Sequence, residues 1–466
     1  MAIGVAQANL DAIGSQGIAV PRYDRSALAP RILHLGVGGF HRSHMALYTD
    51  ELAAEGSDWA IRGVGLLEAD RRMAESLRGQ DHLYTLIERD SDGAEVQVVG
   101  SIVDYVLAID NVEEFARLLA DPELAIFSLT ITEGGYSLAQ ENPTIEAIAT
   151  GLEARRVAGE APLTILSCDN LPGNGKTAGT AILTVCRSRS AELTRYVEES
   201  CTFPNSMVDR ITPQTAATDR TWLSEVVGLD DAWPVVAEPF RQWVIEDRFA
   251  AGRPRYEDVG ALFTDRVHDW ELYKLRMLNA SHSCMAYLAA LAGVVYVDEA
   301  IAVDGLHRYL ERFLGEEAIP TLDQIPGYPA ADYASTVLSR FANSGVRDQI
   351  ARLCIDGTAK FPSFLIPTIE GELELGGPIE CAALALAGWA RYLAVTPAAE
   401  RAPDPHGERA IALALEALGA PLTFLELDEV FSPPLRESER FRQAFSKASH
   451  SLAADGAFGA VERLLA

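Results

Sequence analysis

Four polar residues lie close together in an otherwise apolar segment, "DWELYKLRMLNASHSCMAYLAALAG" (residues 269–293): Glu271, Lys274, Asn279 and His282. In a regular helix, which turns by about 100° per residue, the four would share about 140° of arc. That face is too apolar for a solvated surface and too polar for a plain core. A lysine there can act as a general base, while an asparagine amide can bind a developing oxyanion and a histidine can orient a hydroxyl group. The alternative is a set of polar groups that bond to one another at a domain interface.

The choice of lysine favours the catalytic interpretation. The 39 basic residues comprise 35 arginines and four lysines, Lys176, Lys274, Lys360 and Lys447. Arginine keeps its proton at any working pH, whereas a lysine in apolar surroundings can lose it. We therefore expect Lys274 to serve as a general acid/base.

A glycine-rich turn, "LHLGVGGFHRSH" (residues 33–44), stands between a predicted strand and a predicted helix. Its first glycine, Gly36, permits a tight turn, and Gly38 lets the backbone approach a pyrophosphate at the start of the helix. The predicted cofactor-binding residues of this turn are Gly36, Gly38, Gly39 and Phe40. His41 stands where the dinucleotide fingerprint usually has a third glycine or an alanine, so the alternative is a tight turn without a ligand.

His41 and His44 also form an HxxH pair, but no nearby cysteine or carboxylate completes a plausible zinc site. We therefore predict no metal.

A dinucleotide site also needs an acid at the end of the second strand, where it bonds the adenosine ribose hydroxyls. The string "GVGLLEADRRM" offers Glu68, with Asp70 behind it. Either carboxylate would repel a 2′-phosphate, which favours NAD over NADP. Arg71 and Arg72 follow directly, and either could pair with that phosphate. The alternative for both acids is an ordinary helix start.

The string "NLPGNGKT" (residues 170–177) resembles a phosphate-binding P-loop, but the pattern requires glycine where Asn170 stands. A nucleoside-triphosphatase is therefore the alternative from a different class. We favour the interpretation that Asp169 and Asn170 lie at the carboxyl end of a parallel strand, where open α/β sheets bind their ligands.

Short apolar runs alternate with amphipathic ones over residues 1–265. The predicted strands are residues 31–40, 59–67, 96–106, 124–132 and 162–169, and the predicted helices between them include 41–56 and 111–123. This alternation predicts a Rossmann-type α/β domain with a mostly parallel sheet.

Residues 266–466 read almost wholly as helix and predict a mainly α-helical substrate and catalytic domain. Its predicted helices are residues 269–293, 304–319, 333–343, 345–357 and 379–395, and a polar loop at 396–408 precedes the last helices. The cleft between the two domains is the expected ligand site.

Composition limits the classes of partner. The net charge of −28 argues against nucleic acid and anionic membranes, both of which would repel the chain. The six cysteines are scattered without a CxxC pair, which indicates reduced, buried thiols. No signal peptide or membrane span is predicted. We expect a cytoplasmic protein.

The chain resembles the polyol-specific long-chain dehydrogenases, and among them most closely the mannitol 2-dehydrogenases. The matching strings are "LHLGVGGFHRSHMALYTDEL", "GVGLLEADRRM", "TITEGGY", "SCDNLPGNG", "FPNSMVDRITP", "EPFRQWVIEDRF", "KLRMLNASH" and "RFANSGVRDQIARLC". The family's KxxxxNxxH motif is matched in full by Lys274, Asn279 and His282. Agreement this dense is highly specific for the family and less so for the substrate.

The resemblance implies a metal-independent, NAD-linked oxidoreductase with Lys274 as general acid/base. Asn170 and Asn279 would form the oxyanion hole, and Glu271 would relay the proton of Lys274 to water. Three further residues would contact polyol hydroxyls: Asp209, Arg352 and Lys360. From the residues alone, Asp209 could equally form a turn, and Arg352 and Lys360 could occupy a solvated helix end.

For the substrate, the resemblance implies a polyol and its ketose, first D-mannitol and D-fructose. Fructuronate reductases and arabinitol 4-dehydrogenases share nearly all of these strings and stay as alternatives. Arg352 could bind a uronate carboxylate as well as a hydroxyl group. The family resemblance also leans towards a monomer.

Overall fold

The computed structural model describes residues 2–109, 111–159, 161–404 and 406–466. The chain divides into two units, Met1–His268 and Asp269–Ala466.

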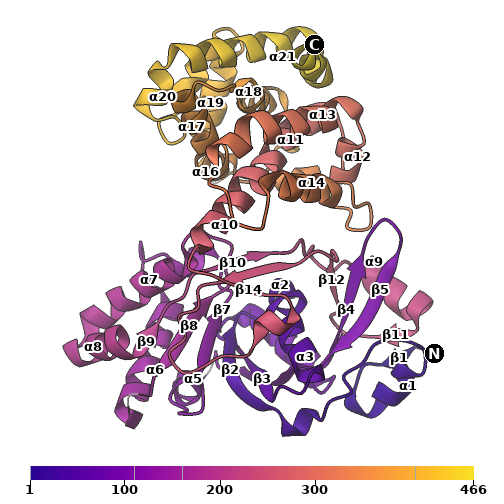
Figure 1. Ribbon diagram of the computed structural model, residues 1–466, viewed down its shortest axis with the longest axis vertical. Helices are drawn as coiled ribbons and strands as arrows, with labels where there is room; N and C mark the ends of the chain where they lie inside the picture. Colours follow the sequence, from indigo (N-terminus) through magenta and orange to yellow (C-terminus); the bar gives the residue numbers. More distant parts are fainter. Residues whose placement is uncertain (1, 110, 160, 405) are drawn as a thin grey trace. The chain divides into compact units, whose positions relative to one another are not determined.

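A parallel sheet of six strands, in the order β6-β3-β2-β7-β8-β9, forms the centre of the first unit (Figure 1). Its strands are β2 (Ala29–Leu35), β3 (Trp59–Gly65), β6 (Ile102–Leu107), β7 (Ile126–Leu129), β8 (Leu163–Ser167) and β9 (Cys201–Thr202). Every residue of β7 and β8 is buried. Strands of this kind are apolar throughout because helices cover both faces of the sheet.

Alternate residues of β2 enter two separate cores. Ile32 packs with Tyr48 on one face of the sheet, while Leu33 packs with Phe115 and Ile148 on the other. The helices of the unit are α1 (Leu10–Gly14), α2 (Gly39–Ser43), α3 (Met45–Ala54), α4 (Arg71–Arg78), α5 (Val112–Leu119), α6 (Pro143–Gly159), α7 (Asn174–Arg189), α8 (Ala191–Ser200) and α9 (Ala217–Trp222). Helices α3 and α4 cover the first face, and α5, α6 and α7 cover the second.

Three smaller sheets complete the first unit. They are β12-β4-β5 (Val235–Ala237, Tyr84–Arg89, Ala94–Val99), β10-β13-β14 (Ser206–Asp209, Gln242–Ile245, Leu262–Phe263) and β1-β11 (Ile3–Gly4, Leu229–Asp230).

Two sequence predictions fail locally in this unit. The single strand predicted at residues 96–106 is two strands in different sheets, β5 and β6, with Gly100 between them. The Gly100 N–H donates to Asp50 (2.6 Å), and a Cβ at this position would lie 2.7 Å from Pro21. The single helix predicted at residues 41–56 is interrupted at His44, whose φ and ψ of −121° and −97° are not helical.

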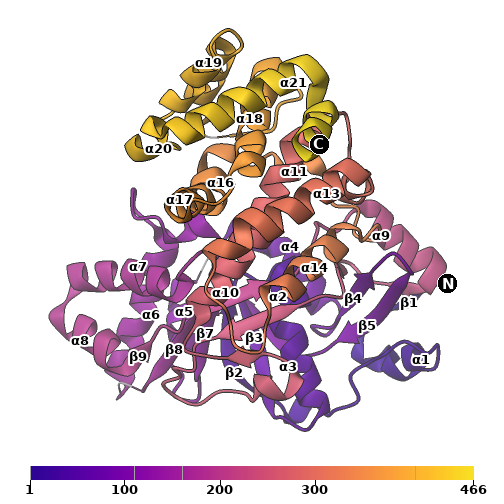
Figure 2. The same ribbon diagram turned by 45° about the horizontal axis from the view of Figure 1, so that its top comes forward.

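The second unit is mainly helical. Its elements are α10 (Val267–Tyr273), η7 (Lys274–Asn279), α11 (Ala280–Leu291), α12 (Val297–Ile301), α13 (Asp304–Arg312), η8 (Phe313–Ala318), α14 (Ala330–Phe341), α15 (Ile350–Leu353), α16 (Gly357–Phe364), α17 (Ile366–Leu375), α18 (Glu380–Val395), α19 (Gly407–Ala417), α20 (Pro433–Glu437) and α21 (Glu439–Leu465). Helix α18, rich in alanine, packs against α11, α19 and α21 at the centre of the unit (Figure 2).

The helix predicted at residues 345–357 is wrong over most of its length. Only Ile350–Leu353 forms a short helix there, because Arg347 and Asp356 adopt left-handed backbone conformations (φ 52° and 59°) that interrupt the winding. The predicted loop at 396–408 is irregular up to Gly407, where α19 begins, and Pro405 lies outside the described residues.

The predicted fold class, a mostly parallel α/β domain followed by a mainly helical one, is confirmed. Within the described ranges no helix combines the length and apolarity needed to cross a membrane. All six cysteines are buried free thiols, as the composition predicts.

Candidate active site

The glycine-rich turn follows β2 directly, and its first glycine is required by space. Gly36 has φ +97°, and a Cβ there would lie 2.1 Å from the carbonyl oxygen of Thr130 on the chain leaving β7. The Thr130 hydroxyl donates to the Gly36 carbonyl (2.6 Å), which fixes the turn against the neighbouring strand. No residue with a side chain could take this position without displacing β7.

The second glycine leaves the backbone accessible. A Cβ at Gly38 would meet nothing nearer than the Gly36 carbonyl at 3.8 Å, and one at Gly39 would meet Thr212 at 3.5 Å. Helix α2 begins at Gly39, so backbone N–H groups at its start stand beside this open surface. The turn therefore fits the pyrophosphate of a dinucleotide cofactor.

The departure from the fingerprint at His41 has a packing reason. The ring of His41 stacks on that of His34, from β2, with 3.5 Å between centroids and 12° between planes. His34 in turn bonds Ser128 (2.8 Å) and Thr130 (3.0 Å). Burial lowers the pKa of His34 to about 3 and holds that of His41 well below its ordinary value. The histidine pair thus takes the place of the close helix–strand contact that a small residue provides.

The two candidate ribose acids are placed differently. Glu68 pairs with Arg71 (2.7 Å), and 73% of its side chain is exposed. Asp70 accepts from the Leu67 N–H (2.9 Å), and its Cβ would be 2.5 Å from a Cβ built on Gly65, the last residue of β3. Asp70 is therefore held at the end of the second strand, where a ribose-binding acid is required.

The P-loop resemblance at residues 170–177 does not extend to its geometry. A Cβ at Gly175 would lie 2.3 Å from the Pro204 carbonyl, so this glycine serves close packing of α7. The Gly175 N–H donates to the side chain of Asn174 (2.8 Å), and the Lys176 N–H donates to Asn205 (3.2 Å). Amide groups satisfied within the protein are not arranged to hold a triphosphate.

Asn170 is exposed directly after β8, beside a well-anchored carboxylate. Asp169 is buried and accepts from the N–H groups of Ile131 (3.1 Å) and Thr132 (2.7 Å) and from the Tyr136 hydroxyl (2.6 Å). Burial raises the pKa of Asp169. The rigid loop end positions Asn170 at the carboxyl edge of the sheet.

Asn174 connects β10, the strand that ends at Asp209, to the segment after β8. The buried Asn174 amide donates to the carbonyls of Asp169 (3.0 Å) and Ser206 (2.7 Å), and so ties the end of β8 to the start of β10. Asp209, the last residue of β10, is 2% exposed.

In the second unit, the segment that carries the lysine is wound as a π-helix. Residues Lys274–Asn279 form η7, between α10 and α11, and the Ala280 N–H donates to the carbonyl of Leu275, five residues back. The predicted helix at residues 269–293 is confirmed as a helical segment up to Leu291, but its winding is not regular over Lys274–Asn279. In a π-helix the hydrogen bonds join residues five apart, so Lys274 and Asn279 lie closer together around the axis than the roughly 140° of a regular helix. The spacing KxxxxN equals the hydrogen-bond spacing of a π-helix.

Lys274 and Glu271 are both buried, with 7% and 6% of their surface exposed. Both side chains are thus largely shielded from bulk water, and burial disfavours a charged form that has no compensating partner.

His282 lies one turn into α11, with its ring stacked on Phe341 (4.2 Å between centroids). Burial lowers its pKa to about 3, although the nearby Asp348 acts to raise it. The Nε2 atom of His282 is buried without a hydrogen-bond partner among the described residues. A neutral ring with an unused nitrogen can donate or accept one hydrogen bond.

Arg352 and Lys360 lie near His282 in the second unit. Two guanidinium nitrogens of Arg352 donate to the two carboxylate oxygens of Asp348, one of them over 2.7 Å. Burial acts to raise the pKa of Asp348, but the hydrogen bonds and charge of Arg352 hold it below its ordinary value. The Lys360 amine donates to the Leu353 carbonyl (3.1 Å), and burial, followed by the charge of Arg352, lowers its pKa.

Sequence reasoning missed Asp348 and Phe341. Asp348 stands four residues before Arg352, a spacing that suggests an ion pair on the helix predicted at residues 345–357; the pair forms although Asp348 lies outside the short helix Ile350–Leu353. Phe341 gave no signal beyond its apolar character.

The histidines at 41 and 44 are used in packing. His41 stacks on His34, and His44 Nε2 lies 3.0 Å from the Gln242 carbonyl. Within the described ranges, no three His, Cys, Asp or Glu side chains are grouped so that they could hold a metal ion.

Family models match both parts of the chain. Residues 30–258 match the mannitol dehydrogenase Rossmann domain, and residues 266–453 match the mannitol dehydrogenase C-terminal domain. Mannitol 2-dehydrogenases of Phaeosphaeria nodorum and Aspergillus terreus are each 39% identical to this chain. The first match covers 95% of this chain and 82% of the relative, and the second covers 96% of both.

Two solved structures support the same family. The Pseudomonas fluorescens mannitol 2-dehydrogenase, in a ternary complex with NAD and D-mannitol, is 38% identical over 99% of both chains, with a TM-score of 0.88. A D-sorbitol dehydrogenase in substrate-free form is 35% identical over 95% of this chain and 97% of that one, with a TM-score of 0.87. The predicted family is confirmed: the chain belongs to the mannitol dehydrogenase family.

Proposed function

We propose that this protein interconverts D-mannitol and D-fructose, with Lys274 as the general acid/base. As a member of the mannitol dehydrogenase family, it is an NAD-dependent polyol dehydrogenase. The substrate pair and the roles of the residues are the parts that we propose.

The lysine and two asparagines carry the proton chemistry. NAD, when bound, supplies the hydride acceptor for oxidation. Lys274 Nζ takes the proton of the substrate hydroxyl during oxidation and returns it to the carbonyl oxygen during reduction. Asn170 and Asn279 donate amide hydrogens to that oxygen as negative charge develops on it. The burial of Lys274 and the shared π turn with Asn279 support this assignment.

Glu271 and His282 assist the lysine. Glu271, one turn earlier and equally buried, passes the proton on towards water. His282 orients a substrate hydroxyl as a neutral ring, which its low pKa supports. Asp209 and Lys360 bind further hydroxyl groups.

The observation that carries the substrate assignment is the pairing of Arg352 with Asp348. A uronate needs a cation for its carboxylate, but two nitrogens of Arg352 already bind a carboxylate within the protein. Neutral hydroxyl groups need no such counter-charge, so the pair favours a polyol or ketose over a uronate.

We assign the cofactor to residues 1–265 and the catalytic lysine to residues 266–466. Gly36, Gly38, Gly39 and Phe40 would hold the pyrophosphate, and Asp70, with Glu68 beside it, would bind the ribose hydroxyls. The open backbone at Gly38 and the placement of Asp70 at the end of β3 support this assignment.

The deciding experiment measures NADH oxidation with fructose, fructuronate and xylulose in parallel, and NAD⁺ reduction with mannitol, sorbitol and arabinitol. The sorbitol arm is included because a D-sorbitol dehydrogenase is among the similar structures. We expect the highest kcat/KM with fructose and with mannitol. A value for fructuronate more than about tenfold above that for fructose, a difference of about 1.4 kcal/mol, would overturn the assignment.

We also propose that the reaction needs no metal. The lysine with two amide donors can stabilise the charge that a Lewis acid would otherwise stabilise. Dialysis against EDTA is expected to leave kcat unchanged. Activity that is lost on chelation and returns with zinc would contradict the mechanism.

A further inference from the structure

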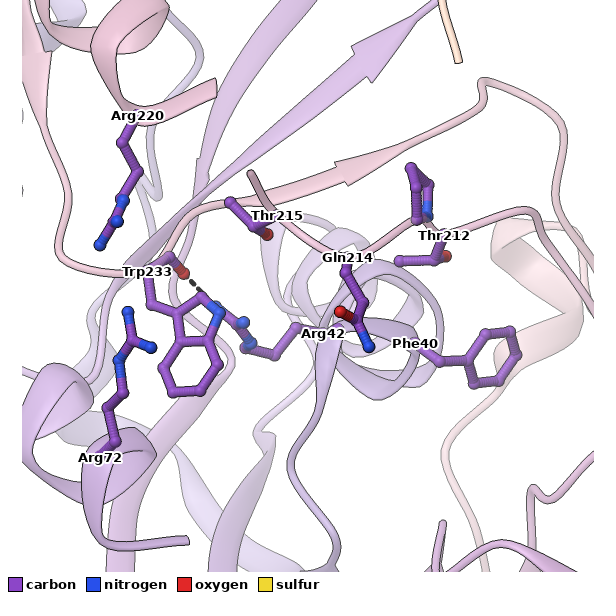
Figure 3. Close-up of a pocket in the computed structure, with 10 residues that line it drawn as sticks. Phe40, Arg42, Arg72, Thr212, Gln214, Thr215, Arg220 and Trp233 are labelled. Atoms are coloured by element: carbon purple, nitrogen blue, oxygen red, sulfur yellow. Dashed lines mark hydrogen bonds between the residues drawn. The ribbon is translucent and has the colours of Figure 1, made fainter. Parts of the chain in front are cut away.

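A polar cavity of about 400 Å³ lies in the first unit beside the glycine-rich turn (Figure 3). It is lined by Gly39 and Phe40, by the segment 212–215, and by three arginines around one tryptophan: Arg42, Arg72, Arg220 and Trp233. In Figure 3 the guanidinium groups of Arg72 and Arg220 point toward the same space beside the Trp233 ring.

The lining carries three positive charges and no carboxylate. This is unusual in a chain with a net charge of −28, in which many other exposed arginines pair with an acid, for example Arg31 with Asp58 and Arg117 with Glu114. The cavity is therefore a local positive field on an acidic protein, which attracts anions.

Two of the arginines are fixed in place by the tryptophan. Arg72 lies over the Trp233 ring, 4.4 Å from its centroid, and Arg42 lies 5.9 Å from the same ring. Arg42 is buried, and its side chain donates to the backbone carbonyls of Gly38 (3.3 Å) and Trp233. Two cations on one indole repel each other, and a bound anion between them would relieve that repulsion.

The third arginine is unused. Within the described part of the chain, the side chain of Arg220 makes no hydrogen bond or ion pair, and that of Arg72 makes none beyond its contact with Trp233. Both side chains are exposed, so their N–H groups are available to a ligand.

We propose that this cavity binds a phosphate group, with Arg72 and Arg220 as its ligands. Guanidinium groups present paired N–H donors that match phosphate oxygens, and two such groups on one cavity suit a doubly charged phosphate monoester. Neither residue belongs to the polyol chemistry described above.

The position of the cavity favours one source of that phosphate. It extends from the glycine-rich turn to the first turn of α4, directly after Asp70, and these are the two segments that a bound dinucleotide must contact. Asp70 would repel the 2′-phosphate of NADP(H), but Arg72 and Arg220 would offset that repulsion, so the enzyme would use NADPH beside NADH. This source rests on the proposed function, and a free phosphate ester is the other source.

The test uses the full-length protein and three probes: 5′-AMP, 2′,5′-ADP and inorganic phosphate. Their dissociation constants are measured by calorimetry for wild type, Arg72→Gln, Arg220→Gln and the double variant. Arg195→Gln is the matched control, because it removes an exposed positive charge from α8, away from the cavity. The KM values for NADH and NADPH are measured with fructose on the same proteins.

We expect 2′,5′-ADP to bind roughly tenfold tighter than 5′-AMP, and the double variant to abolish that difference. The KM for NADPH should rise by a similar factor while the KM for NADH stays constant. If inorganic phosphate binds and the double variant abolishes its binding, but 2′,5′-ADP has no advantage, the cavity holds phosphate from a free ester.

Two results would overturn the proposal. One is a double variant that behaves like Arg195→Gln with every probe. The other is equal weakening of 5′-AMP and 2′,5′-ADP, which would make the arginines an ordinary contact of the cofactor. A protein without activity towards any polyol or ketose would refute the proposed function instead. The dissociation constants would still show whether the cavity binds phosphate.

Discussion

At the scale of single residues, Lys274 is the sharpest test of the mechanism. Lys274→Ala should keep the fold and NADH binding but lose roughly 10²-fold or more in kcat, the lower end of what a general base contributes. Lys447→Ala, a lysine of α21, is the matched control and should keep full activity. A Lys274→Ala protein that retained more than a tenth of wild-type activity would show that the lysine is structural.

Chemical rescue separates the proton-transfer role of Lys274 from a packing role. Small primary amines should restore part of the activity of Lys274→Ala, because they can occupy the vacated space and exchange a proton. Lys274→Arg should remain inactive, since guanidinium keeps its proton. Rescue by arginine but not by amines would point to a charge requirement only.

Asp348 offers a second residue-scale test, on specificity. Asp348→Asn removes the carboxylate that holds Arg352, and the released cation should favour an anionic substrate. The ratio of kcat/KM for fructuronate to that for fructose should rise by roughly tenfold, equivalent to about 1.4 kcal/mol. Asp332→Asn, at an exposed position on α14, is the control. An unchanged ratio would mean that Arg352 does not face the substrate.

The role of a residue was predictable where the chemistry requires an amino acid that is rare in this chain. It was not predictable where the role depends on a partner residue in the fold. Position 274 stood out in the sequence because it holds one of four lysines in a chain with 35 arginines. The spacing of Asp348 and Arg352 was visible, but the geometry of their ion pair could not be derived, because the helix predicted there does not form at Asp348. Placement of the two candidate ribose-binding acids was likewise hidden, because it depends on the different partners of Glu68 and Asp70 in the fold.

At the scale of elements, the stacked histidines beneath the glycine-rich turn predict a pH dependence of stability. The folded-state pKa of His41 lies well below 6.5, first because of burial and then because of the charges of His34, Arg42 and His44. The unfolded chain therefore binds a proton below about pH 6.5 that the folded chain excludes. The contribution of His41 to the free energy of unfolding is therefore fully present above that pH and is lost as the pH falls.

His41→Ala should reduce this loss. Between pH 7.5 and pH 5 the free energy of unfolding, measured in urea, should fall by about 2 kcal/mol less in the variant than in wild type. A constant offset from the missing ring is expected at both pH values and does not affect the comparison. His307→Ala, an exposed histidine of α13, serves as the control. A variant with the wild-type pH dependence would show that His41 is protonated in the fold.

Element boundaries show where periodicity was sufficient and where it failed. The central strands follow from apolar runs between turns, because a sheet covered on both faces leaves little choice of residue. The π winding at Lys274–Asn279 could not be derived, since a pattern based on about 100° per residue assumes regular winding and places Asn279 about 140° from Lys274. The break at Gly100 was hidden inside an apolar run, and the Gly100 N–H donates there to the side chain of Asp50.

At the scale of the whole molecule, the proposed chemistry is divided between two units. The glycine-rich turn, Asp70, Asn170 and Asp209 belong to Met1–His268, whereas Lys274 and its motif belong to Asp269–Ala466. The order of an α/β unit before a helical one was predictable, because alternating strand and helix patterns give way to helix patterns alone near residue 266. Hydrophobic patterns could not predict which unit carries the cofactor and which carries the lysine, because that assignment rests on the family motif.

A fragment of residues 1–268 tests that division. The fragment contains the whole central sheet with both of its cores, so it should fold and bind NADH with a dissociation constant close to that of the full chain. It should show no turnover with fructose or mannitol, because Lys274, Asn279 and His282 are absent. NADH binding is measured by fluorescence titration and folding by circular dichroism, with full-length Lys274→Ala as the second inactive protein. A fragment that is folded but fails to bind NADH would refute the assignment of the cofactor to the first unit, while the mechanism at Lys274 would stand on its own tests.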